Sequence, residues 1–441
     1  MDRVCERIVR RTRRRKGRVL LGCAATLAAL ATAVGCAAKD GDPTLVRAAA
    51  PKDRPVVSAA DRQAAAASTS AFGLDLYRAL ATTAPGPEGN LMVSPSSMEN
   101  ALGMLLPGAR GRTGTELSGV LHNTLSTDRF TAALGALGRD EQAQADTDHT
   151  RLREADAVWT QKDFGVQRSY LQSLSDAFDT GVHVADFRTD PDGARRTVND
   201  TVNRQTDGQI KDLFPSGAID NSTRLVLTDA VTFRAKWQQS FTAADTADEP
   251  FHRLDGSTSD VRMMNHTGQY GYAEGSGWQA VELPYQGGHL AMDVLLPTSG
   301  GLPGFVSSLT PERLSQILGG LHDTGLRVAL PRFTFDSQQT LNRTLARLGM
   351  PTAFDGGQAD FGGIPTDPAA RIHVQSVVQK AHVAVDEDGT TAAAGSGVAM
   401  GATATPVPRM AFRADRPFVF LIRDPHSGHT LFVGQVTDPG R

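Results

Sequence analysis

One stretch near the C-terminus, Asp386–Pro408 (DEDGTTAAAGSGVAMGATATPVP), limits what this 441-residue chain can fold into. It lies between two runs that are typical of strands, Ile372–Val385 and Arg416–Arg423. From Glu387 to Gly401 it consists mostly of small side chains, whereas surface loops usually carry residues that form turns or stay solvated. A segment this slender could slide between two strands of a sheet.

The residues of this stretch also alternate with the period of a strand. One face of an extended chain would hold Thr390, Ala392, Ala394, Ser396, Val398 and Met400. The other would hold Thr391, Ala393, Gly395, Gly397, Ala399 and Gly401. The first face becomes more apolar along its length, and the second stays small. The pattern favours a strand with one side against a core, and a flexible Gly/Ala/Ser linker is the alternative.

Residues 1–36 have the pattern of an export signal. Nine Arg and Lys residues lie between Arg3 and Arg18, and the uncharged apolar run Val19–Gly35 follows. The sequence Ala33-Val-Gly-Cys36 is similar to a bacterial lipoprotein cleavage box, with Cys36 as the lipid acceptor. Alternatives are a box ending at Cys23, ordinary secretion, or an uncleaved anchor near the shortest spanning length. We expect an extracellular protein, secreted or lipid-anchored to the outer face of the cell membrane.

Charge and cysteine usage exclude several classes of function. Residues 1–35 carry nine positive and two negative side chains, so their removal takes the formal net charge from −3 to −10. An acidic mature protein argues against a nucleic-acid partner. All three cysteines lie in the first 36 residues. The rest of the chain therefore has no disulfide and no thiolate chemistry.

The remaining chain divides into a tether and a single domain. Residues 37–67 are rich in Ala, Pro and Asp and are predicted to be a disordered tether, and residues 68–441 a folded domain. Expected helices are Ser70–Leu80, one beginning at Ser94-Pro95, Gln167–Phe178, Asp192–Asn203 and Leu341–Leu348. Expected strands are Ala155–Trp159, Val182–Phe187, Arg224–Phe233, Trp278–Pro284, Leu290–Pro297 and Leu326–Phe335. Because strands and helices neither repeat nor alternate regularly, the predicted class is α+β.

No catalytic or metal-binding motif stands out. The chain lacks a G-x-S-x-G elbow, a P-loop, HExxH and CxxC, so we expect no enzyme activity, no metal and no cofactor. His426 and His429 flank Gly428 in a predicted hairpin turn, and we expect both to be exposed. Asp229 falls inside the apolar run Arg224–Phe233 and needs a partner, because a lone buried carboxylate is costly.

The chain from about Ser68 to its C-terminus resembles the serpin family of serine protease inhibitors. The motifs that carry the resemblance occur in family order. They are Phe72…Leu76-Tyr77, Asn90…Ser94-Pro-Ser-Ser97…Thr113, Leu227-Thr-Asp-Ala-Val-Thr-Phe233…Lys236-Trp237, Val261-Arg-Met-Met264, Leu283-Pro-Tyr285, Leu330-Pro-Arg-Phe333, Asp360-Phe-Gly-Gly-Ile364, Glu387-Asp-Gly-Thr390, Ala414-Asp-Arg-Pro-Phe418 and Leu431-Phe-Val-Gly434. Their order over most of the chain makes the resemblance specific.

The resemblance implies a fold of three β-sheets and about nine helices with an exposed reactive-centre loop, here about residues 387–408. A target serine protease would cleave the loop and remain covalently attached while the freed arm inserts into the main sheet. Insertion would start at the hinge. The hinge residues are Glu387, Asp388, Gly389, Thr390, Thr391, Ala392, Ala393 and Ala394. This Thr/Ala run is typical of inhibitory members, and a non-inhibitory serpin acting as a binding or structural protein is the alternative.

The resemblance also implies the position of the cleaved bond. Thr403 lies fourteen residues after Gly389 and nine residues before Phe412, so both family spacings indicate Thr403–Ala404. Ala402–Thr403 and Thr405–Pro406 remain alternatives. A small uncharged residue there suits elastase-like or subtilisin-like proteases. No Arg or Lys follows until Arg409, which argues against trypsin-like targets.

Two residues depart from the family pattern in the middle of the main sheet. Relatives usually have Asn and His where this chain has Asp229 and Gln379, and we expect the Gln379 amide to donate to the Asp229 carboxylate. Ser94 and Ser97 would lie nearby as capping and hydrogen-bonding residues, and Trp237 would be a packing residue at the top of the sheet. No basic helix matches the heparin-binding relatives, and a monomer is expected. A solute-binding lipoprotein is a third alternative, suggested by the signal alone.

Overall fold

The computed structural model describes residues 44–49, 54–82, 89–147, 150–390 and 410–440. The described residues belong to one compact unit. The predicted signal, Cys36, and loop residues 391–409, with the predicted bond Thr403–Ala404, lie outside the described residues. Among the helices that are described, none has both the length and the apolar character needed to cross a membrane.

The main sheet has eight strands in the described part of the chain, in the order β1-β5-β4-β6-β14-β13-β12, with β3 paired to β6. Their bounds are β1 Leu45–Val46, β3 Arg151–Glu154, β4 Ala157–Gln161, β5 Val182–Ala185, β6 Leu225–Lys236, β12 Phe333–Thr340, β13 Ser376–Val385 and β14 Gly389–Thr390. As its near-continuous apolar sequence predicts, β6 is buried on both faces along most of its length.

A second sheet contains nine strands. Their bounds are β2 Leu91–Val93, β7 Ala247–His252, β8 Thr258–Gly275, β9 Trp278–Pro284, β10 Ala291–Pro297, β11 His322–Pro331, β15 Met410–Arg413, β16 Phe418–Arg423 and β17 Thr430–Val436. The long strand β8 pairs with β7, β11 and β9 in turn. The family resemblance implied three sheets, but within the described residues β8 joins the two smaller ones into a single hydrogen-bonded sheet.

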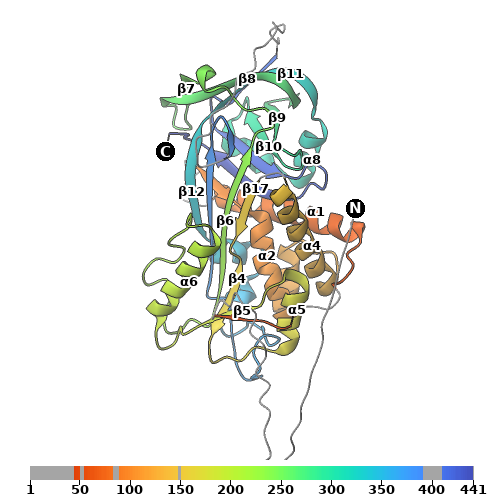
Figure 1. Cartoon of the computed structure of the whole chain (residues 1–441), viewed down its shortest axis with the longest axis vertical. Coiled ribbons are helices and arrows are strands. Elements are labelled where there is room, and N and C mark those ends of the chain that lie inside the picture. The colour runs from red at the N-terminus through yellow and green to blue at the C-terminus, as the bar shows by residue number, and fades with distance from the viewer. Residues whose placement is uncertain (1–43, 50–53, 83–88, 148–149, 391–409, 441) are drawn as a thin grey trace, which may run out of the picture. The chain divides into compact units, whose positions relative to one another are not determined.

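Nine α-helices occur in the described part of the chain, as expected. They are α1 Ala59–Ala81, α2 Pro95–Leu105, α3 Gly111–Val120, α4 Thr127–Thr147, α5 Arg168–Phe178, α6 Pro191–Gln205, α7 Gly301–Ser308, α8 Pro311–Gly319 and α9 Asn342–Leu348, together with the 3₁₀ turns η1 Leu106–Gly108, η2 Ala243–Asp245 and η3 Pro351–Phe354. In Figure 1, α6 lies on one side of β6, and α1, α2, α4 and α5 lie on the other. The α+β class is confirmed.

Three hydrophobic cores hold these layers together. The largest joins α1, α2 and α4 to the sheets. The second lies between the two sheets and includes Phe233 of β6 against Phe432 of β17. The third packs Val198 and Val202 of α6 against Trp159 on the opposite face of the main sheet. The main sheet is therefore covered on both faces, and any strand added to it would be buried.

Two boundaries differ from the sequence-based expectation. The predicted tether of residues 37–67 is wrong for its C-terminal part, because α1 begins at Ala59 with Ser58 as its N-cap and β1 pairs with β5. The predicted strand Leu326–Phe335 is two strands, β11 and β12. They meet at Arg332, whose backbone N–H donates to Arg262 O at 2.9 Å, and each joins a different sheet.

Candidate functional site

The two central strands of the main sheet, β6 and β13, pair directly over only part of their length. They are parallel from Ser376 opposite Val226 to His382 opposite Thr232. Beyond that point β14 lies between them, with Gly389 opposite Lys236 of β6 and Thr390 opposite Val385 of β13. We call the directly paired part of β6 and β13 the seam. The start of the predicted reactive loop thus already lies between the two strands, just beyond the end of the seam.

The chain reaches this position through a tight turn after β13. The backbones of Asp386 and Gly389 exchange hydrogen bonds of 2.9 and 3.3 Å, and the Asp386 carboxylate accepts from the N–H groups of Asp388 and Gly389. A Cβ atom at Gly389 would lie 2.0 Å from Ala235 O and 2.7 Å from Lys236 Cα. Only glycine can therefore pass this close to β6 without displacing it.

Thr390 is fully buried beneath an aromatic stack. Its hydroxyl is 2.7 Å from Tyr285 Oη, and the Tyr285 ring stacks on Trp237 with centroids 4.6 Å apart and planes inclined by 8°. The Trp237 indole N–H donates to Asp386 O at 2.9 Å, and its backbone N–H donates to Asp388 O at 2.9 Å. Trp237 is a packing residue, as expected, and it also fixes the turn.

Glu387 secures the outer side of the same turn. It forms an ion pair with Arg332 and accepts a hydrogen bond of 2.5 Å from Thr246 Oγ1. Burial raises the pKa of Glu387, but the bonds from Arg332 and Thr246 outweigh it, and the net pKa is lowered. The side chain therefore stays ionised, and the turn is held by charge-assisted hydrogen bonds.

Further down the seam, Gln379 and Asp229 face each other as predicted. They are register partners on β13 and β6, and Gln379 Nε2 donates to Asp229 Oδ2 at 2.7 Å. Gln379 also bonds to the backbone N–H and C=O of Ser94 at 3.1 and 2.9 Å. Ser94 caps α2 by accepting from the Ser97 N–H at 3.3 Å. One amide thus links both central strands to the start of α2.

A second acidic residue, Asp156, which the sequence analysis did not single out, completes this cluster. Ser97 Oγ lies 2.7 Å from Asp229 Oδ1 and 2.6 Å from Asp156 Oδ1. A hydroxyl donates only one hydrogen, so the three groups are all satisfied when one carboxyl carries a proton. Desolvation by burial raises the pKa of Asp229 to about 7, and burial followed by the charge of Asp229 raises the pKa of Asp156 well above its usual value.

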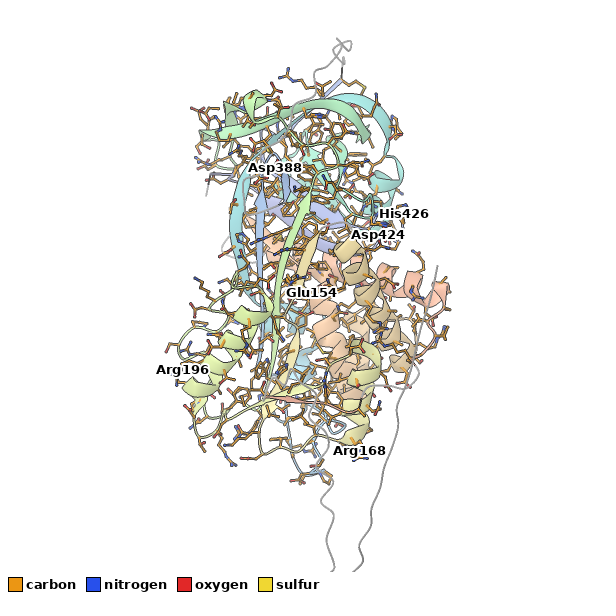
Figure 2. All side chains as sticks on the ribbon, in the orientation of Figure 1. Glu154, Arg168, Arg196, Asp388, Asp424 and His426 are labelled. Carbon is orange, nitrogen blue, oxygen red and sulfur yellow. The ribbon has the colours of Figure 1, made fainter. Side chains whose placement is uncertain are left out.

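The turn and the acidic cluster lie at different levels of the main sheet. Figure 2 shows Asp388, in the turn, above Glu154, which precedes Asp156 and adjoins the cluster. Burial, reinforced by the charges of Glu141 and Asp229, raises the pKa of Glu154 to about 8. Contacts at three levels therefore hold the two central strands in place. They are the turn after β13, the stacked rings of Tyr285 and Trp237, and the hydrogen bond between Gln379 and Asp229.

The structure places several predicted site residues together and leaves others untested. Ser94, Ser97, Asp229 and Gln379 form one hydrogen-bonded cluster, and Glu387–Thr390 form the turn beside Trp237. The hinge residues Thr391, Ala392, Ala393 and Ala394 lie outside the described residues. The sequence analysis missed Asp156, Tyr285, Thr246 and Arg332. Tyr285 and Arg332 belong to motifs that were recognised, Leu283-Pro-Tyr285 and Leu330-Pro-Arg-Phe333, whereas Asp156 and Thr246 carry no local signal.

The two histidines of the hairpin turn differ from each other. The His426 side chain is 77% exposed, as predicted, and projects at the surface in Figure 2. The prediction for His429 is wrong, because its side chain is buried and pairs with Glu141 of α4. Burial lowers the pKa of His429, but the nearby carboxylates, Glu141 foremost, outweigh it and raise the net pKa. Among the residues described, no group of three or more His, Cys, Asp or Glu could hold a metal ion.

Sequence comparisons identify relatives along nearly the whole domain. The family described as Serpin (serine protease inhibitor) matches residues 67–439. An uncharacterized serpin-like protein of Thermococcus kodakarensis is 34% identical, over 88% of this chain and 87% of its own length. Human leukocyte elastase inhibitor is 33% identical, over 83% of this chain and 97% of its own length.

Solved structures share the fold. Native protease nexin-1, crystallised with heparin, aligns with a TM-score of 0.74 at 26% identity and covers 86% of this chain and 99% of its own. The thermophilic serpin tengpin in its native state aligns with a TM-score of 0.78 at 23% identity, over 89% and 97% of the two chains. At that identity the likeness shows the fold alone. Together, the family match and the relatives show that this chain belongs to the serpin family of serine protease inhibitors.

Proposed function

We propose that this serpin inhibits serine endopeptidases as a suicide substrate, and that it is not itself an enzyme. One observation carries the proposal: Gly389–Thr390 lies as a short strand between β6 and β13 and is antiparallel to both, so an extension of this strand would run toward the seam. An arm released by a cut near Thr403–Ala404 would need only to extend a strand that has already begun.

The covalent step follows ordinary acyl transfer. The serine oxygen of the protease attacks the carbonyl carbon of Thr403, and the C–N bond to Ala404 breaks. The proton of the serine passes through the general base of the protease to the departing amine of Ala404. Thr403 then remains bound to the protease as an ester, and this ester is the species that must be trapped before water hydrolyses it.

The strand directions supply a driving force for insertion. β6 and β13 are parallel to each other, whereas β14 is antiparallel to both. An inserted arm would therefore replace one parallel ladder by two antiparallel ladders, which are slightly more stable per residue. The gain must exceed a backbone ordering cost of about 1–2 kcal/mol per residue. Small residues facing the core at Ala392 and Ala394 keep the steric cost of insertion low.

We propose elastase-like or subtilisin-like proteases as targets. The residues around Thr403 are small and uncharged, which suits a shallow specificity pocket, and no basic side chain occurs from Glu387 to Pro408. The name of the human relative at 33% identity refers to leukocyte elastase, which agrees with this class.

A protease panel tests the proposal. Pancreatic elastase, subtilisin and trypsin are each incubated with the serpin and analysed on denaturing gels, and mass spectrometry locates the cut. We expect stable complexes with elastase or subtilisin, none with trypsin, and a new N-terminus at Ala404. Rapid cleavage without any complex would instead identify a non-inhibitory serpin.

We also propose that the protein acts outside the cell as a monomer, held at the membrane by a lipid on Cys36. The basic and apolar pattern of residues 1–36 supports export, and Cys36 ends that segment. Expression with radiolabelled palmitate should label the wild type and not Cys36→Ser, which should appear in the medium. Secretion of unlabelled wild-type protein would exclude the anchor and leave the inhibitory function untouched.

A further inference from the structure

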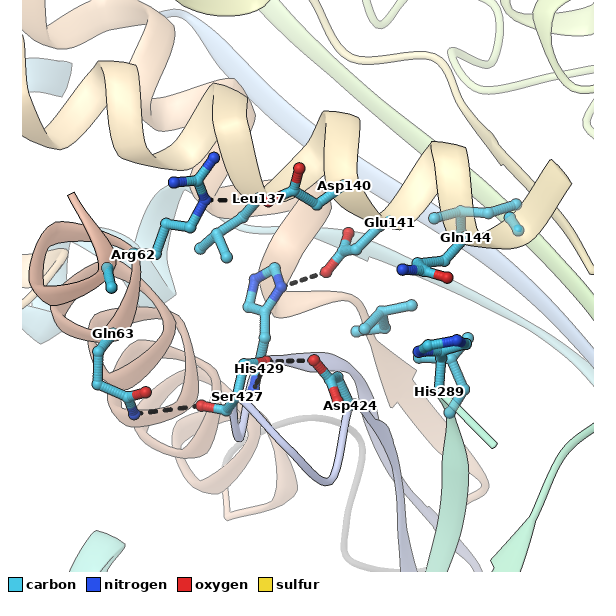
Figure 3. A pocket seen from close by; sticks show the side chains of 15 residues that line it. Arg62, Gln63, Leu137, Asp140, Glu141, Gln144, His289, Asp424, Ser427 and His429 are labelled. Atoms are coloured by element: carbon cyan, nitrogen blue, oxygen red, sulfur yellow. Dashed lines mark hydrogen bonds and ion pairs between the residues drawn. The ribbon is translucent and has the colours of Figure 1, made fainter. Parts of the chain in front are cut away.

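A cavity of about 240 Å³ lies outside the seam, between the start of α1, the middle of α4 and the turn that joins β16 to β17. Figure 3 shows His429 rising from that turn toward Glu141 on α4, with Asp424 below and His289 and Gln144 toward one end. Its volume is below the roughly 300–1,000 Å³ of sites for drug-sized ligands. A ligand of this cavity would therefore be small.

One side chain in the cavity lacks the partners that its burial demands. The Glu141 side chain is 10% exposed, and its contact among the described residues is the ion pair with His429. The His429 imidazole engages Oε1, whereas Oε2 is buried and accepts no hydrogen bond within the described part of the chain. An ionised carboxylate has about four acceptor positions, so this one has unused capacity toward the cavity.

The other charges around the cavity leave an excess of negative charge. Asp140 is bonded to Arg62 at 3.0 Å, and Asp424 lies in the turn with the Ser427 hydroxyl at 2.6 Å. Three carboxylates, those of Asp140, Asp424 and Glu141, line the cavity with one guanidinium, that of Arg62, and two imidazoles, those of His289 and His429. A further imidazole, that of His426, lies 3.4 Å from Asp424. The carboxylates therefore outnumber the permanently charged cation. These carboxylates would attract a cation electrostatically, and they would repel an anion.

The walls between these charges are apolar. Leu137 and Ala145 come from α4, Leu152 from β3, Leu290 from the segment before β10, and Leu431 from β17. A ligand with a hydrocarbon body would bury that body here, at about 25 cal/mol for each Å² removed from water. The cavity thus has an apolar wall that can bind the hydrocarbon part of a ligand, next to the hydrogen-bond acceptor Glu141.

We propose that this cavity is a binding site for a small amphipathic amine, a primary ammonium group carried on a compact aromatic or branched aliphatic body. The ammonium donates hydrogen bonds to the free acceptor positions of Glu141, and the body packs against Leu137, Leu290 and Leu431. The site is separate from the seam and from the reactive loop, so the proposal stands whether or not the protein traps proteases.

Calorimetric titration with three isosteric probes tests the charge requirement. Benzylamine is compared with benzyl alcohol and benzoate on the full-length wild-type protein at pH 7. We expect saturable binding of benzylamine and no binding of benzoate. Benzyl alcohol should bind at least about tenfold more weakly, because its hydroxyl donates one uncharged hydrogen bond where the ammonium donates charge-assisted ones. Equal affinity for the amine and the alcohol, or no amine binding at millimolar concentration, would overturn the proposal.

Matched variants test the residue assignment. Glu141→Gln should weaken benzylamine binding about tenfold or more, whereas Asp128→Asn, an exposed acid at the start of the same helix, should leave it within twofold. If Glu141→Gln does not fold, side-chain NMR of the wild type decides the point. Benzylamine should shift the His429 imidazole resonances and leave those of His373, which does not line the cavity, unchanged. A shift of neither histidine, or of both equally, would refute the site.

Discussion

Gln379 and Asp229 lie directly opposite each other on the two parallel central strands of the main sheet, and they are joined by a 2.7 Å hydrogen bond. The same amide is bonded to the backbone of Ser94 at the start of α2. Opening the seam at this level requires breaking these contacts in a fully buried place. In the proposed mechanism these strands separate when the loop inserts, so the pair would control how readily the native form converts to the inserted form.

Removing the amide should weaken the native state. Gln379→Ala leaves a buried carboxylate oxygen of Asp229 and the backbone N–H of Ser94 without partners, at about 1–3 kcal/mol for each group. The carbonyl of Ser94 keeps its bond from the Met98 N–H. We expect a lower thermal midpoint and faster spontaneous conversion to an inactive inserted form, measured as loss of inhibitory activity with time. Gln205→Ala, at an exposed position of α6, is the control and should convert at the wild-type rate. An unchanged rate of spontaneous conversion in Gln379→Ala would show that the bond between Gln379 and Asp229 does not control the opening of the seam.

Stability should fall as the pH rises through neutrality. Burial raises the pKa of Asp229 to about 7 and the pKa of Glu99 to about 8, so the native state binds more protons than the unfolded state, where these acids have ordinary pKa values. The resulting stabilisation is complete near pH 4 and is lost between about pH 4 and 8. The raised pKa of His429 acts in the same direction, because its charge is lost as the pH rises.

Urea midpoints measured between pH 5 and 8 test this dependence. Asp229→Asn, which keeps the shape of the side chain without the charge, should flatten the profile, and the exposed control Asp323→Asn should not. A midpoint that increases toward pH 8 in the wild type would contradict the assignment of the buried acids.

A large charge at the first inserted position should abolish trapping. Thr390 is fully buried under Tyr285, so Thr390→Arg would have to carry a guanidinium into the core, and insertion would stall at its first step. We expect cleavage by elastase without a stable complex, and therefore a rise in the stoichiometry of inhibition. Thr390→Ser retains the hydroxyl that bonds Tyr285 and should still form complexes. Undiminished complex formation by Thr390→Arg would refute the hinge assignment.

A methyl group at Gly389 should expel the short strand β14. The added Cβ would lie 2.0 Å from Ala235 O, a backbone atom that cannot move aside cheaply. We expect Gly389→Ala to lower the thermal midpoint and to increase hydrogen exchange at Lys236 and Trp237. Gly119→Ala, where nothing lies within 4 Å of the added atom, should be neutral or slightly stabilising. Equal exchange in the two variants would show that the turn tolerates the clash.

Local periodicity predicted many elements well. The predicted strand Trp278–Pro284 coincides with β9, and the predicted helix Gln167–Phe178 differs from α5 by a single residue at its start. Both segments have apolar residues at the spacing of one buried face, which is a local property. The contact between Gln379 and Asp229 was also predicted, because these two residues stand where relatives usually have Asn and His.

Other features depend on distant residues and could not be predicted locally. The first turns of α1 are so rich in alanine that they lack an amphipathic pattern, and only packing against α4 and the sheets reveals the helix. His429 is buried because Glu141, nearly three hundred residues earlier, provides its partner. Asp156 belongs to no recognised motif. It joins the buried cluster only because the fold of α2 brings the Ser97 hydroxyl within hydrogen-bond distance of its carboxyl group.

The central claim is that the intact protein is held in a less stable form than the one it reaches after cleavage. The most direct measurement compares the thermal midpoints of the intact protein and of protein cut near residue 403 with a catalytic amount of elastase. We expect a markedly higher midpoint for the cleaved form, because its arm would complete the main sheet between β6 and β13. An unchanged midpoint after complete cleavage would contradict the account.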